Sequence, residues 1–200
     1  MKKNPILLTM LFLFSSCSLL LKNVYGYKEI KEFDQKEYDK FIAEIKQSYP
    51  VNDKVSTYNE FYNYIALGKD SIQRKDLSQP IQILYFDRDS LVSFHANCYA
   101  KGQLSGLDWN YENRFSIFPP HSAKNPEDFN SIRFKKINEI FQFNDKLKKY
   151  TIIIFWTRMF EKISKDAIYL VINNLKTNKV KDAQIILINT DHFFFKENQF

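Results

Sequence analysis

A strand–helix–strand unit over residues 150–189 constrains the fold more than any other feature of this sequence. Residues 150–156, YTIIIFW, form a continuous apolar run, which is typical of a strand buried on both faces. Residues 185–189, IILIN, form a second such run, and apolar residues recur at helical spacing between the two. Two buried strands joined by a helix pair in parallel through a right-handed crossover. The sequence therefore predicts an α/β fold.

A β-hairpin is predicted before this unit, over residues 80–100. Ile81, Ile83 and Tyr85 alternate along the first strand, and residues 87–90, DRDS, supply the turn. The alternation in the second strand places Val92, Phe94, Ala96 and Cys98 on one face and Ser93, His95, Asn97 and Tyr99 on the other. The hairpin and the parallel unit together predict a small mixed sheet.

Cys98 and the three histidines are the candidates for catalysis or metal binding. His95 and Cys98 lie three residues apart, so on a strand they point to opposite faces and do not form a catalytic pair. The small and apolar neighbours of Cys98 predict a buried, inert thiol. His95, His121 and His192 lack metal-ligand spacing, and no serine elbow, P-loop or dinucleotide fingerprint is present. We predict no catalytic, cofactor or metal residue, and an exported enzyme that uses Cys98 or a metal remains the alternative.

Amphipathic helices are predicted on both sides of the hairpin. Residues 28–49 carry one apolar stripe, and Pro50 ends that helix. A second helix opens with Thr57 and Glu60 in capping-box register. A third helix, over 127–148, follows a cap residue and a proline and begins with two acids. We expect these helices to cover the sheet, and partner binding is the alternative.

Residues 101–126 form the irregular part of the chain. Aromatic and polar residues alternate there, and long loops are uncommon in compact domains unless they have a function. Trp109, Tyr111, Arg114 and Phe118 are therefore candidates for contact with a partner. The alternative is a loop that its aromatic residues fold back onto the core.

The first 20 residues have the layout of an export signal. Two lysines precede an apolar stretch over residues 5–14, and small residues and Cys17 follow. The junction of Ser16 and Cys17 resembles the lipobox of bacterial lipoproteins, although Phe14 stands where leucine is commonest. That resemblance implies cleavage before Cys17 and attachment of lipid to it. An uncleaved membrane anchor and an ordinary cleaved signal peptide are the alternatives, and all three place the chain from about residue 28 outside the cytoplasm.

The strand–helix–strand unit resembles the first half of a thioredoxin-like domain. The resemblance covers residues 150–191 and rests on Phe155 and Trp156, the helix, and the pair Asn189 and Asp191. A hairpin that precedes this unit gives the order β-β-α-β-α-β, which a circular permutation of a thioredoxin would produce. An unrelated four-stranded α/β sheet is the alternative.

The thioredoxin resemblance also implies that the chemistry of that family is absent. It places the two catalytic cysteines at Phe160 and Ile163 and the buried carboxylate at Ile154. Phenylalanine and isoleucine neither form a thiolate nor accept a proton, so thiol–disulfide exchange has no nucleophile there. The domain is expected to be redox-silent.

The charge of the chain argues against a nucleic-acid partner. The formal net charge is +6, with 29 basic and 23 acidic residues. Lys2 and Lys3 lie in the expected signal, which leaves 27 basic against 23 acidic residues, a net of +4. These charges are interspersed and no nucleic-acid motif occurs, so we expect a solvated mixed-charge surface.

These observations divide the chain into a signal peptide (1–16), a lipid anchor and tether (17–27), a helical annex (28–78) and an α/β domain (79–200). The expected function is that of a membrane-anchored lipoprotein of the bacterial cell envelope, with a redox-silent thioredoxin-like domain as binding module or scaffold. Its expected partners are the membrane and an unknown protein. An immunity-type or structural lipoprotein is a further alternative.

Overall fold

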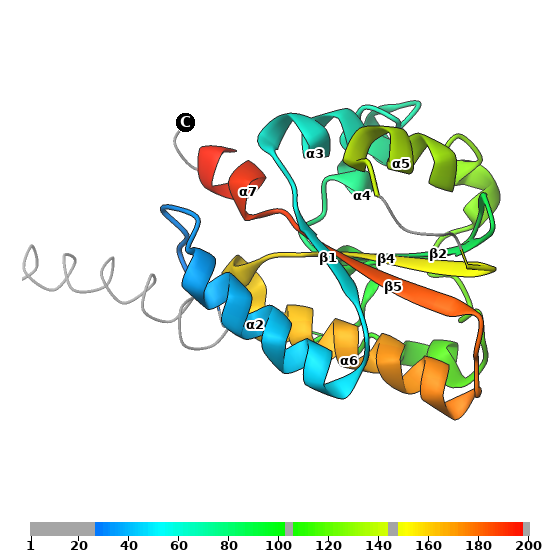
Figure 1. The fold of residues 1–200 in the computed structure, drawn as a ribbon. Helices are drawn as coiled ribbons and strands as arrows, with labels where there is room; N and C mark the ends of the chain where they lie inside the picture. The colour runs from blue at the N-terminus through cyan, green and yellow to red at the C-terminus, as the bar shows by residue number, and fades with distance from the viewer. Residues whose placement is uncertain (1–26, 103–105, 144–147, 198–200) are drawn as a thin grey trace, which may run out of the picture.

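The computed structural model describes residues 27–102, 106–143 and 148–197, which form a mixed α/β fold around a five-stranded sheet (Figure 1). The strands are β1 (Asn52–Val55), β2 (Gln82–Asp87), β3 (Ser90–Ala96), β4 (Tyr150–Trp156) and β5 (Ala183–Asn189). Their order is β1-β5-β4-β2-β3; β5 is parallel to β1 and β4, and β2 is antiparallel to β4 and β3. The predicted combination of a hairpin with a parallel βαβ unit is confirmed, in an arrangement consistent with a thioredoxin-like fold.

Helices cover both faces of the sheet. One face carries α2 (Gln35–Ser48) and α6 (Glu161–Thr177). The other carries α3 (Tyr58–Ile65), α4 (Ser71–Leu77), α5 (Phe134–Phe141) and α7 (Asp191–Glu197). The 3-10 helices of the described residues include η1 (Asn97–Tyr99), η3 (Tyr111–Ser116), η4 (Pro126–Phe129) and η5 (Arg158–Phe160). The sheet is therefore the middle of three layers.

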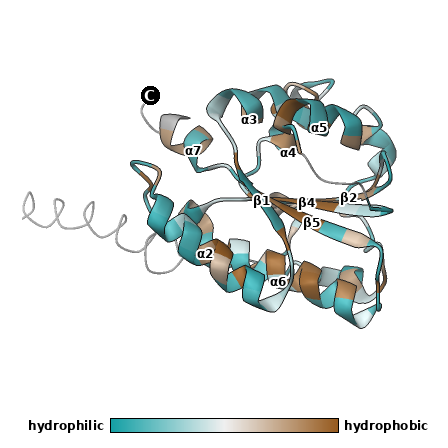
Figure 2. Ribbon diagram, viewed as in Figure 1, coloured by the Kyte–Doolittle hydropathy of each residue, from teal (hydrophilic) through white to brown (hydrophobic). Residues whose placement is uncertain are grey.

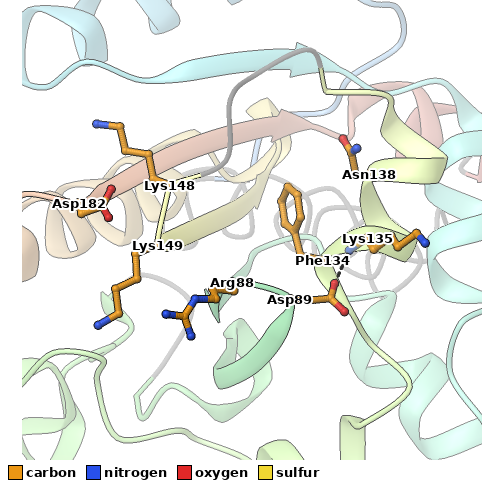
Figure 3. Close-up of a pocket in the computed structure, with 8 residues that line it drawn as sticks. All are labelled: Arg88, Asp89, Phe134, Lys135, Asn138, Lys148, Lys149 and Asp182. Atoms are coloured by element: carbon orange, nitrogen blue, oxygen red, sulfur yellow. Dashed lines mark hydrogen bonds between the residues drawn. The ribbon is translucent and has the colours of Figure 1, made fainter.

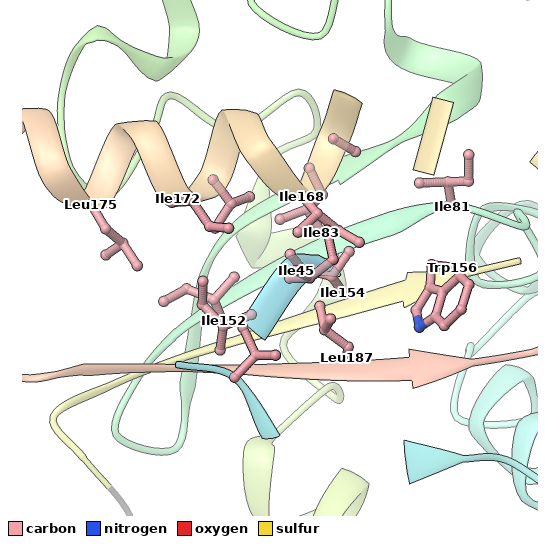
Figure 4. Close-up of a cluster of buried hydrophobic side chains, with 14 of the residues drawn as sticks. Ile45, Ile81, Ile83, Ile152, Ile154, Trp156, Ile168, Ile172, Leu175 and Leu187 are labelled. Atoms are coloured by element: carbon pink, nitrogen blue, oxygen red, sulfur yellow. The ribbon is translucent and has the colours of Figure 1, made fainter. Parts of the chain in front are cut away.

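Two hydrophobic cores result from this layering, because successive side chains of β4 and β5 point to opposite faces. Ile152, Ile154 and Trp156 of β4 pack with α2 and α6 (Figure 4). Ile153 and Phe155 pack against the helices of the other face. All five side chains are fully buried, which confirms the prediction of a strand covered on both faces. Figure 2 shows the same pattern, with β4 and β5 predominantly hydrophobic.

The N-terminal part of the chain contains a strand that the sequence did not predict. β1 pairs with β5 from Asn52 to Val55, so the segment 28–78, expected to form a helical annex, also contributes to the sheet. The first predicted helix begins at Gln35 rather than residue 28, because Asp34 caps it by accepting the Glu37 N–H. The second has the predicted capping box.

The predicted helix over 127–148 is wrong. In the described part of that range, the chain forms η4 and the eight-residue α5. Between them Arg133 forms a β-bridge with Ser90, and the Phe134 N–H donates to the Asp89 carbonyl oxygen, which holds the backbone extended. After α5, Gln142 adopts a left-handed conformation with φ of 54°, which ends the helix.

Both edge strands of the sheet, β1 and β3, leave few backbone groups available for pairing with another strand. At one edge, β1 has four residues, and Lys54 pairs with Glu60 at 2.8 Å and donates to the Phe141 carbonyl oxygen. At the other edge, the Phe94 N–H of β3 donates to the Ser122 hydroxyl at 2.8 Å. The Ala123 N–H donates to the Phe94 carbonyl oxygen at 3.0 Å, so the segment after the irregular loop covers β3.

Candidate functional site

The carboxyl ends of β4 and β5 form the candidate functional site. These strands are neighbours, but β4 leads through η5 into α6 on one face, and β5 leads into α7 on the other (Figure 1). In open α/β sheets, ligands bind at the carboxyl ends of strands where the following connections diverge in this way. We call this region the carboxyl edge.

A buried ion pair joins the two strands at the carboxyl edge. The Nε atom of Arg158 lies 2.5 Å from Oδ2 of Asp191, and their side chains are 5% and 0% exposed. Asp191 also accepts hydrogen bonds from the Arg158 backbone N–H and the Thr157 hydroxyl, both at 2.8 Å. These bonds offset the cost of removing the carboxylate from water. The ion pair therefore fixes the end of β4 against the start of α7.

Further polar contacts at the carboxyl edge hold this arrangement together. Thr157 accepts the Met159 N–H, and Ser164 donates its hydroxyl hydrogen to the Thr157 carbonyl oxygen at 3.0 Å. Asn189 accepts the Asp191 N–H, and Ser56 donates to the Asn189 carbonyl oxygen at 2.8 Å. Because Ser56 follows β1, the network connects the ends of three parallel strands.

The segment 27–33, which we call the strap, lies across the carboxyl edge. The Lys28 N–H donates to the Met159 carbonyl oxygen at 2.9 Å, and Arg158 donates to the Glu32 carbonyl oxygen at 3.2 Å. Phe33 packs over the Arg158 guanidinium at 5.4 Å and stacks on the His192 ring with centroids 4.8 Å apart. The start of the described chain therefore covers the edge that is otherwise best placed for a ligand.

The positions that the thioredoxin resemblance assigns to catalysis hold packed apolar side chains. Phe160 is half-buried and contacts the Tyr27 ring of the strap at 5.9 Å. Ile163 is buried in the core beside α2, and Ile154 is fully buried in β4. Trp156 stacks on Phe41 with centroids 3.9 Å apart. This turn can support packing, but its side chains offer no redox-active group.

The candidate partner residues of the irregular loop are buried or half-buried. Trp109 is 5% exposed and lies in the core beside α2 and α6, and Phe118 packs against that core. Asn174 of α6 holds the loop down by donating to the carbonyl oxygens of Phe115 and Ile117, both at 2.7 Å.

The other two loop candidates, Tyr111 and Arg114, are half-buried, as Phe118 is. Lys101 lies over the Tyr111 ring at 4.2 Å, and the Arg114 guanidinium lies 3.5 Å from the Glu112 carboxylate. The structure therefore favours the alternative of a loop folded back onto the core.

The predicted burial of Cys98 is wrong. β3 ends at Ala96, so Cys98 lies in η1 and is exposed. Partial desolvation of the sulfur and the nearby Asp76 carboxylate raise the pKa of the Cys98 thiol. The thiol is therefore accessible but poorly ionised at neutral pH.

His95 lies in the core beside α2 and α6. Its Nε2 is 3.0 Å from the Ser93 hydroxyl, its ring contacts Phe115, and burial followed by the Arg114 charge lowers the pKa of His95 to about 3. The predicted face assignment is wrong at Val92. Tyr85 pairs with Ser93 and Phe86 with Leu91, so Val92 is the extra residue of a β-bulge in β3. Val92 therefore faces this core, while Phe94 faces the other.

The remaining histidines and the comparisons with known proteins add no chemistry to this site. His121 is exposed and His192 stacks on the strap, and in the described ranges no three His, Cys, Asp or Glu residues are close enough to hold a metal ion. Among those same residues, every helix is too short or too polar to cross a membrane. The chain matches no family model, and neither the curated proteins nor the solved structures include a match.

Proposed function

We propose that this protein is a membrane-anchored lipoprotein of the bacterial cell envelope whose α/β domain is a redox-silent binding or scaffold module. The anchoring part rests on the sequence alone. Cys17 follows small residues and an apolar stretch, in the pattern of a lipobox, and lies outside the described residues.

The packing of Phe160 and Ile163 is the main support for a domain without redox activity. The turn between β4 and α6 has the strand–turn–helix form expected of a thioredoxin-like active site, and these two residues stand where its cysteines would be. Their side chains contact the strap and the core, so the position contributes stability instead of a thiolate. The strap also covers this turn, which supports a role in holding the domain to its anchor.

A radioactive fatty acid fed to cells that express the full chain tests the anchoring. Wild-type protein should incorporate the label and fractionate with membranes, and Cys17→Ser should do neither. Cys98→Ala is the matched control, because it removes the other cysteine and should leave labelling unchanged. Equal labelling of wild type and Cys17→Ser would end the proposal. More than one acyl chain is expected, because a single chain gives only marginal anchoring.

A further inference from the structure

Five exposed cations gather at the end of the sheet opposite the carboxyl edge, and we call this region the basic end. They are Arg88, Lys135, Lys148, Lys149 and Lys181. The Arg88 N–H donates to the Lys149 carbonyl oxygen at 2.7 Å, and the Tyr150 N–H donates to that of Asp182 at 3.0 Å. These bonds bring the hairpin turn and the starts of β4 and β5 together.

None of the five cations of the basic end forms an ion pair with a described carboxylate. Across the described ranges, none of the five lies within 4.0 Å of a carboxylate oxygen. Three carboxylates lie nearby, on Asp87, Asp89 and Asp182. Asp89 already accepts the Lys135 backbone N–H at 2.7 Å. Among the described residues, the five cations outnumber these carboxylates, and the resulting positive charge attracts anions.

Two hollows flank Lys148 at the basic end. The first has a volume of about 780 Å³, and Arg88, Phe134, Lys135 and Lys149 are among its other lining residues (Figure 3). The second has a volume of about 630 Å³ and is lined by Lys148, Lys181 and Lys46, the last of which pairs with Asp53 at 2.5 Å. Cations therefore continue from one hollow to the next.

The directions of these side chains show which kind of anion fits. In Figure 3 the charged ends of Lys135, Lys148 and Lys149 diverge instead of meeting at one point, so they do not enclose a single phosphate. A chain of successive anionic groups can contact them one after another. Phe134 is only 3% exposed, so it offers no platform on which nucleic-acid bases can stack.

We propose that the basic end binds a linear polyanion without bases, namely an anionic polymer of the cell envelope with phosphate or carboxylate groups along its length. The location of this domain outside the cytoplasm, where it would meet such a polymer, rests on the proposed function. The strap leaves the domain at the carboxyl edge, and the seven residues of β4 separate the two ends by about 20 Å. An anchor attached through the strap joins the domain at the end away from the basic end, which favours a polymer over the lipid surface as the ligand.

The test measures binding of full-length protein in neutral detergent to inorganic polyphosphate and to polygalacturonate at 50 and 200 mM salt. The test variant is Arg88→Gln with Lys148→Gln and Lys149→Gln. The control, Lys31→Gln with Lys36→Gln and Lys40→Gln, removes the same charge from exposed sites near the carboxyl edge. Circular dichroism checks that both variants fold.

We expect the wild type to bind at least one polymer, with affinity falling as salt rises, and the test variant to bind at least tenfold more weakly. The control should change affinity less than twofold. Preference for polyphosphate or polygalacturonate would identify the anionic group. The proposal is overturned by equal losses in both variants, by no binding at 50 mM salt, or by tighter binding to single-stranded DNA or phosphatidylglycerol vesicles. Fatty-acid labelling of Cys17 is a separate readout, so the two proposals fail independently.

Discussion

The Asp191 carboxylate holds both the guanidinium and the backbone N–H of Arg158, although the two residues follow different strands. Removal of one partner from a buried pair leaves the other charge unpaired, so Asp191→Asn should destabilise the fold by roughly 3–5 kcal/mol. Urea unfolding measures this loss. Asp166→Asn is the control, because Asp166 pairs with Lys162 at the surface, and it should cost no more than about 1 kcal/mol. Equal effects would show that the buried pair has no special role.

The strap should loosen when Phe33 is truncated. Phe33→Ala removes the stack on His192 and the contact with Arg158, so the Lys28 amide should exchange its hydrogen with solvent at least tenfold faster. Hydrogen exchange read by mass spectrometry measures this change. Tyr62→Ala, at an exposed position of α3, should leave it unaltered. Unchanged protection in Phe33→Ala would mean that other contacts hold the strap.

The turn between β4 and α6 should accept a disulfide without having native redox activity. Unmodified protein should show no disulfide reductase activity, because Phe160 and Ile163 provide no thiolate. Phe160→Cys with Ile163→Cys should form a 160–163 disulfide on oxidation, detectable by peptide mass spectrometry. Each single variant controls for pairing with Cys98. Reductase activity in the unmodified protein would refute the redox-silent proposal, and failure to form the disulfide would favour an unrelated sheet.

Cys98 should be labelled in the native protein, because it is exposed. Its raised pKa leaves less thiolate than an unperturbed cysteine has at pH 7, so iodoacetamide should react more slowly than with a model peptide. The rate should rise as pH approaches the thiol pKa. Cys98→Ala should lose the label and change the free energy of unfolding by about 0.5 kcal/mol or less. A rate at pH 7 above that of the peptide would contradict the raised pKa.

His95 should make the fold less stable in acid. Its pKa is about 3 in the folded protein and near 6.5 when unfolded, so only the unfolded chain binds the proton between these values. Its contribution to stability is fully present above about pH 6.5 and decreases as pH falls toward 3, by on the order of 1 kcal/mol per pH unit. Urea unfolding at pH 7, 6 and 5 measures this slope. His95→Gln should flatten it, and an unchanged slope would assign it to other groups.

The elements that the sequence predicted best are those whose burial is complete. The apolar runs of β4 and β5 have no alternative to the centre of a sheet, and the alternation in β2 and β3 identifies a hairpin. β1 was missed because NDKV, at 52–55, is polar and half-buried, and only pairing with β5 makes it a strand. The helix over 127–148 was overestimated because the bridge between Ser90 and Arg133 forms across the fold.

The carboxyl edge was predictable only in part. Asn189 and Asp191 stood out after a buried strand, but nothing in the sequence pairs Asp191 with Arg158, 33 residues earlier. The crossover through α6 brings them together. The position of the strap was equally difficult to predict, because the contacts of Phe33 depend on where β4 and β5 end.

The edges of the sheet, one short and one covered, matter for a protein confined to a surface. Anchoring in the manner proposed restricts diffusion to two dimensions and raises the rate at which copies meet. Exposed strand edges would then serve as templates for intermolecular pairing and aggregation. The charged, four-residue β1 and the Ser122–Ala123 segment against β3 leave little backbone for a second copy to pair with. Dense packing on a membrane is therefore compatible with this fold remaining monomeric at its sheet edges.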